Sequence, residues 1–135
     1  VALKTAERIL PTGQDGLNGT HETRLYASNI SSIDLSRNEE LILVYAEAQI
    51  GSNNALAIAA LDVIRNAAEL PNYNGATDDA SLVTEMLNQR RYSLWSENHR
   101  MFDLRRYNLS NTLPIDRDGD IVYNVFPVPL TDVQE

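Results

Sequence analysis

The chain has 135 residues, 43% of them hydrophobic, with a formal net charge of −8 at pH 7 and no cysteine. This length predicts one domain with a modest core. The negative charge disfavours nucleic acid as a partner, and the lack of cysteine excludes disulfides and thiolate metal sites. With only two histidines, we expect no metal and no cofactor. No apolar run approaches the roughly 20 residues that a membrane-spanning helix needs, so the chain is predicted not to span a membrane.

The first quarter of the chain, residues 1–35, is predicted to be a loop-rich lead-in. Apolar residues fall on one side of Val1–Leu10 when it is drawn as a helix, which favours a short helix there. The glycines of residues 11–20 predict a loop. Residues 25–33 are rich in Asn and Ser and are predicted to be irregular or a short strand.

Residues 36–106 are predicted to be a helical scaffold. Ser36 and Glu39 fit a capping box at the start of a first helix, and Gly51 lies where a glycine would end it. Glu47 falls among apolar residues, so we expect it to be partly buried and to need a cationic partner. The apolar face expected to point at the core consists of Leu41, Val44, Tyr45 and Ala48.

A second helix is predicted from Ser52 or Asn53, either of which can cap it, to about Glu69, before Pro71. The short turn between the two helices predicts an antiparallel helical hairpin. Such hairpins are typical of tetratricopeptide-like repeats, although only one hairpin is visible here. The expected core face of the second helix consists of Leu56, Ala60, Val63, Ile64 and Ala67.

A long third helix is predicted from a cap at Thr77 or Asp78 to about Asn98, and a short helical turn follows His99. Its core candidates are Leu82, Val83, Met86, Leu87, Leu94 and Trp95.

Residues 107–135 are predicted to be a loop followed by an extended tail. The alternating aspartates of residues 116–120 resemble a calcium loop, but the glycine and the final glutamate of that motif are misplaced, which favours a polar turn. Residues 121–126 alternate enough for a short strand. Pro127 and Pro129 exclude a helix or central strand after it.

The segment 88–107, NQRRYSLWSENHRMFDLRRY, is dense in arginine and aromatic residues. It is either a binding surface or a set of paired structural charges, and its acids favour pairing. Tyr92 and Trp95 could stack on a sugar ring, although their positions on a helix favour core packing. We find no assembled catalytic set. The expected ion-pair network, with Glu97–Arg100 and Asp103–Arg106 as local pairs, comprises Glu47, Arg90, Glu97, Arg100 and Asp103.

Four stretches in this order resemble the C-terminal part of the SusD/RagB family of glycan-binding lipoproteins. They are residues 43–49 (LVYAEAQ), 55–65 (ALAIAALDVIR), 88–106 and 126–130 (FPVPL). The chain departs from the family pattern at Gln89, where an acid is usual, at Asn98, where glycine is usual, and at residues 92–94, which lack the usual acid.

The resemblance implies a tetratricopeptide-like helical fold and a non-enzymatic role in oligosaccharide uptake. It implies attachment to the outer membrane through a lipidated cysteine upstream of this chain, which we expect to be the C-terminal part of a longer protein. It also implies a partner, a SusC-like TonB-dependent transporter. The alternative is a tetratricopeptide-type protein–protein interaction domain with no glycan role. A glycoside hydrolase is disfavoured because the sequence nominates no pair of carboxylates.

Overall fold

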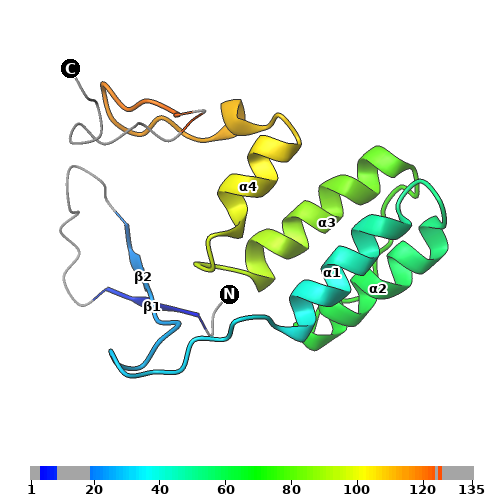
Figure 1. Ribbon diagram of the computed structural model, residues 1–135, viewed down its shortest axis with the longest axis horizontal. Coiled ribbons are helices and arrows are strands. Elements are labelled where there is room, and N and C mark those ends of the chain that lie inside the picture. Colours follow the sequence, from blue (N-terminus) through cyan, green and yellow to red (C-terminus); the bar gives the residue numbers. More distant parts are fainter. Residues whose placement is uncertain (1–3, 9–18, 124, 126–135) are drawn as a thin grey trace, which may run out of the picture.

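The computed structural model describes residues 4–8, 19–123 and 125, and within them the chain is mostly helical. Figure 1 shows the helices packed side by side, except the last, which lies beside the end of the helix before it, and the short strands to one side. The predicted all-α class with a helical hairpin is thereby confirmed. The elements are β1 (Thr5–Glu7), β2 (His21–Thr23), α1 (Asn38–Gln49), α2 (Asn54–Ala67), α3 (Asp79–Ser93), α4 (His99–Arg106) and a 3₁₀ turn, η1 (Ser110–Thr112).

The turn and cap residues explain where most helices begin and end. Gly51 adopts a φ of 83° just after α1, a conformation that favours glycine. The side chain of Asn53 accepts a hydrogen bond from the Leu56 amide and begins α2, and Asp78 does the same for Ser81 in α3. The capping box predicted at Ser36 is wrong, because α1 begins one residue later, after Arg37, with no side-chain cap.

The core lies between α1, α2 and α3. The face of α1 that packs into this core is not the one predicted from the sequence. Leu43 is fully buried, whereas Leu41 is 59% exposed and Val44 and Tyr45 are about half exposed. Nearly every residue from 41 to 46 is apolar, so the spacing alone allows two faces, and packing against α2 and α3 selects one. The buried residues of this core cluster are Leu43, Ala46, Ala57, Ala60, Leu61, Ile64, Leu82, Met86, Leu87 and Leu94.

The predicted faces of α2 and α3 fare better. On α2, Ala60 and Ile64 are buried as expected, but Leu56, Val63 and Ala67 are exposed. The buried alanines of α2 fit the close approach of α1 and α2, which form the most extensive helix pair. The α3 candidates are buried or partly buried, Trp95 included.

Two predictions about helices are wrong. Within the described part of the helix expected over Val1–Leu10, Thr5–Glu7 form strand β1, in which Ala6 pairs antiparallel with Glu22 of β2. The backbone hydrogen bonds there are made with a partner strand and not within a helix. The third helix ends at Ser93 and not at Asn98, because Ser96 and Asn98 adopt left-handed φ values of 62° and 63°. The chain reverses there, and α4 begins at His99.

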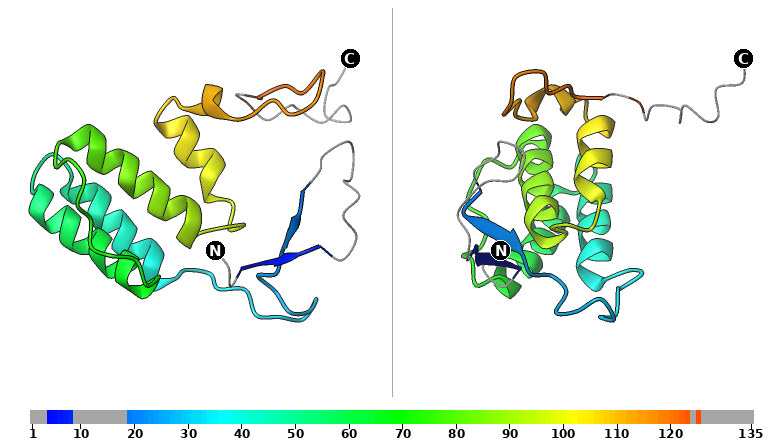
Figure 2. Two further views of the ribbon diagram at one scale, coloured as in Figure 1. Left: turned by 180° about the vertical axis from the view of Figure 1, so that it is seen from behind. Right: turned by 90° about the vertical axis from the view of Figure 1, so that its left-hand side faces the viewer.

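After α4 the chain leaves the helical bundle toward the side on which the strands lie (Figure 2). Residues 121–123 and 125 are not in a strand, which contradicts the predicted strand over residues 121–126 for the part described. The predicted extended tail and the FPVPL stretch lie outside the described residues.

Candidate functional site

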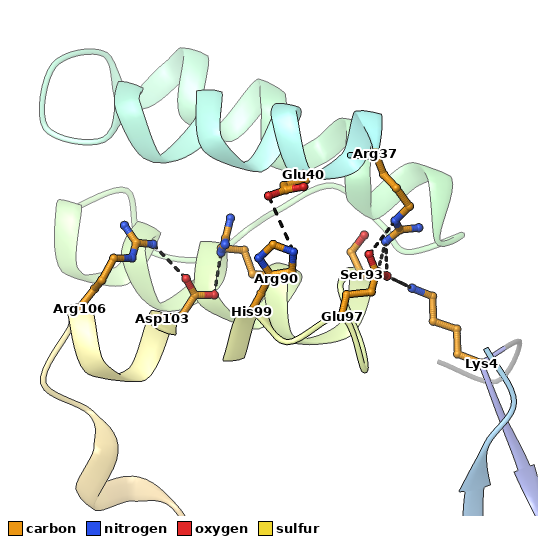
Figure 3. A network of polar contacts seen from close by, with 9 residues as sticks. All are labelled: Lys4, Arg37, Glu40, Arg90, Ser93, Glu97, His99, Asp103 and Arg106. Atoms are coloured by element: carbon orange, nitrogen blue, oxygen red, sulfur yellow. Dashed lines mark hydrogen bonds and ion pairs between the residues drawn. The ribbon is translucent and has the colours of Figure 1, made fainter. Parts of the chain in front are cut away.

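A cluster of ion pairs connects α1, α3 and α4 (Figure 3). Arg90 Nε of α3 donates to Asp103 Oδ2 of α4 at 2.7 Å, with side chains only 7% and 3% exposed. Arg106 joins this pair to α1, because it donates to Asp103 Oδ1 at 2.9 Å and to Glu47 Oε1 at 2.7 Å. Tyr107 Oη donates to the same Glu47 oxygen at 2.6 Å. The structure thus brings together three predicted network residues, Glu47, Arg90 and Asp103, through Arg106.

The electrostatics of Glu47 follow from these contacts. Burial pushes the pKa of Glu47 upward, but hydrogen bonds from Arg106 and Tyr107 outweigh it and leave the pKa below the ordinary 4.5. Burial and the bond to Glu47 raise the pKa of Tyr107 to about 12, so its hydroxyl stays a donor at neutral pH. Glu47 is therefore an ionised acceptor in the folded chain.

Stability should fall in acid partly because of Glu47. A carboxyl whose pKa is lower in the folded state stabilises that state above its unfolded pKa, and this contribution is lost as the pH falls through the folded value. We expect the free energy of unfolding of Glu47→Gln to change less than that of the wild type as the pH drops from about 7 to about 3. Urea unfolding at several pH values measures this. Glu69→Gln, at an exposed position, is the control; equal acid sensitivity of wild type and Glu47→Gln would contradict the assignment.

Glu97, which is predicted to join the same network, belongs to a second group of charges. Glu97 does not pair with Arg100 among the described residues; instead Arg37 donates to it at 2.9 Å, and Lys4 approaches it at 3.4 Å. Both cations also donate to the Ser93 carbonyl, which α3 leaves without a helical partner. No local signal in the sequence marks Lys4 or Arg37 as partners of Glu97, because each lies far from it along the chain.

The remaining predicted residues lie apart from these ion pairs. Within the described part of the chain, Arg100 has neither a hydrogen bond nor an ion pair. Tyr92 is about half exposed beneath the guanidinium of Arg91, 5.7 Å from its ring centre. Trp95 is partly buried, and its Nε1 has no hydrogen-bond partner among the described residues. Whether Tyr92 or Trp95 contacts a ligand stays a prediction.

A cleft of about 960 Å³ lies beside α4, between that helix and the segment that follows it. Its volume is in the range of small-molecule sites in proteins. Trp95 and Tyr123 supply aromatic surface, and Arg91 and Arg100 supply charge. Sequence reasoning missed this cleft because its second wall, residues 110–123, was predicted to be only a polar loop and a strand.

The described residues offer no pair of carboxylates in the cleft and no metal-binding group. Among those lining the cleft, Asp120 is the single carboxylate, and it pairs with Arg117 at 2.9 Å. No described group of three or more His, Cys, Asp or Glu side chains could hold a metal ion. Nor does any helix in this part have the length and apolar character to cross a membrane. The arrangement suits binding by stacking and by charge.

The fold and the cleft define a helical scaffold protein with a candidate ligand surface at one end. A model of the SusD family matches residues 19–131, which is most of the chain. The chain therefore belongs to the SusD family. No curated protein and no solved structure matches it.

Two departures from the family pattern have local explanations. Asn98, where glycine is usual, adopts a left-handed φ of 63°, a conformation that asparagine tolerates better than most residues. Gln89, where an acid is usual, is buried and donates to Glu85 at 2.8 Å. Both substitutions are thus compatible with the turn and the packing of α3.

Proposed function

We propose that this chain is part of a non-catalytic glycan-binding protein that serves nutrient uptake at the outer membrane, where it is held by a lipid anchor. The observation that carries the proposal is the family match over residues 19–131. Its partners would be oligosaccharides and a SusC-like TonB-dependent transporter. The cleft beside α4, with two aromatic rings and few carboxylates, supports binding over hydrolysis.

A glycan array with the full-length protein tests this proposal. We expect binding to at least one class of oligosaccharide and no release of shorter products after long incubation. Co-purification of the TonB-dependent transporter with the tagged protein tests the predicted partner. A blank array would contradict glycan binding, and cleaved products would contradict a non-catalytic role.

One observation favours the alternative of a protein–protein interaction domain. Several large apolar side chains of α1 and α2 are exposed, and the alternative takes them as one surface for a protein partner. Two results together would select this alternative. The full-length protein would bind no glycan on the array, and it would form a complex of defined stoichiometry with a protein partner that Val44→Asp abolishes. The exposed side chains are Leu41, Val44, Tyr45, Leu56 and Val63.

A further inference from the structure

The cleft beside α4 differs in charge from the rest of the protein. Four arginines and one aspartate line it, which gives a formal charge of +3 with His99 neutral, whereas the whole chain carries −8. A positive cleft in an acidic protein attracts anions to one place and repels them elsewhere. The charged lining residues are Arg91, Arg100, Arg105, Arg117 and Asp120.

Two of these arginines lack the carboxylate partners that other arginines of the fold have. Arg65 and Arg90, for example, each meet a carboxylate. Arg91 and Arg100 form no ion pair and no hydrogen bond with any residue that the structure describes; Arg91 stands over the ring of Tyr92. Their donors remain available to a ligand.

Arg91 also lies close enough to Arg100 to disfavour its charge. Burial lowers the pKa of Arg100 and the positive charge of Arg91 lowers it further, and together these outweigh the opposite effects of Asp103 and Tyr92. Guanidinium groups stay positively charged in proteins. An anion between them would relieve this repulsion, and its oxygens would match the planar forks of the two guanidinium groups.

The same cleft carries aromatic surface. Trp95 and Tyr123 line it together with the two arginines, and Tyr123 is 60% exposed. Aromatic rings with a polar edge suit the apolar face of a sugar ring. Charge and stacking surface in one cleft favour a ligand that has both a sugar ring and an anionic group.

We propose that this cleft binds acidic saccharides, with Arg91 and Arg100 holding a carboxylate or sulfate and Trp95 and Tyr123 contacting the ring. The proposal rests on the glycan-binding function proposed above and narrows its ligand class. It assigns Arg100 a ligand-binding role in place of the predicted structural pairing.

Calorimetric titration of the full-length protein compares matched probes. Trigalacturonic acid carries carboxylates, its methyl ester keeps the rings and length without the charge, and maltotriose is neutral; a sulfated disaccharide distinguishes sulfate from carboxylate. We expect trigalacturonic acid or the sulfated disaccharide to bind about tenfold or more tightly than the neutral probes, since a hydrogen bond to a charged group contributes about that factor. This comparison uses the wild type alone, so it does not depend on any variant folding.

Variants locate the site. Arg91→Gln and Arg100→Gln should each weaken binding of the acidic probe about tenfold and leave the neutral probes unchanged. Arg24→Gln is the matched control, because it removes the same charge outside the cleft. Arg24 is an exposed arginine that pairs with Glu22.

The outcomes separate the two proposals. Binding of neutral saccharides with no preference for acidic ones, or acidic binding that ignores both arginine substitutions, overturns the acidic-saccharide site but leaves glycan binding intact. Binding of a pentaglutamate peptide in the absence of saccharide binding overturns it in favour of an acidic peptide ligand. No binding of any saccharide overturns both proposals.

Discussion

Asp103→Ala is expected to lower the free energy of unfolding by roughly 3–5 kcal/mol, the range for breaking a buried ion pair on one side. Asp103 is 2% exposed and accepts from Arg90 at 2.7 Å and from Arg106 at 2.9 Å. Without the carboxylate, Arg90 would remain buried and would lose its ion-pair partner. Its Nη1 already has no hydrogen-bond partner among the described residues, so the pair with Asp103 is its main compensation.

Urea unfolding followed by circular dichroism measures this loss. Asp120→Ala is the matched control, because Asp120 also pairs with an arginine three residues away but lies at the surface. Exposed pairs contribute at most about 1 kcal/mol. Equal losses in the two variants would show that burial of the Arg90–Asp103 pair has no energetic consequence. The double variant Arg90→Met/Asp103→Leu should recover much of the loss, since an apolar pair removes both buried charges.

The helical hairpin could be predicted from local signals. Gly51, Asn53, Pro71 and Asp78 each act on the backbone within a few residues, through a left-handed φ, a side-chain cap or a missing amide. Such effects need no knowledge of distant contacts, and the helix boundaries that depend on them lie close to where the sequence places them.

Features set by distant segments could not be predicted. Strand β1 depends on pairing between Ala6 and Glu22, and the donors at the end of α3 come from Lys4 and Arg37. Intrinsic preferences are overridden when a partner strand or a remote cation satisfies the backbone.

In the candidate site, too, local spacing predicts some contacts, whereas others depend on the path of the chain. The spacing of Asp103 and Arg106 on one helix predicts their ion pair, which the structure has at 2.9 Å. By contrast, the predicted Glu97–Arg100 pair does not form, because Ser96 and Asn98 adopt left-handed φ values and Glu97 lies outside α4. The cleft itself depends on the path of residues 110–123, for which the sequence holds only turn residues.

Leu43→Ala is expected to lower the free energy of unfolding by roughly 2–5 kcal/mol, the usual cost of a large-to-small change in a core. Leu43 is fully buried among residues of α2 and α3. Truncating it leaves a cavity in the layer where the three helices meet, and neighbouring side chains collapse only partly into such a space.

Leu41→Ala is the matched control, two residues away on the same helix. Leu41 is 59% exposed, so the same substitution there should cost less than about 1 kcal/mol. Both variants keep the helix propensity and the net charge equal, and the difference between them reports burial alone. If Leu41→Ala were the more damaging of the two, α1 would present to the core the face predicted from the sequence, which includes Leu41, and Glu47 would turn away from Arg106. Comparing the two variants therefore tests the rotation of α1 and, with it, the contact that ties α1 to α4.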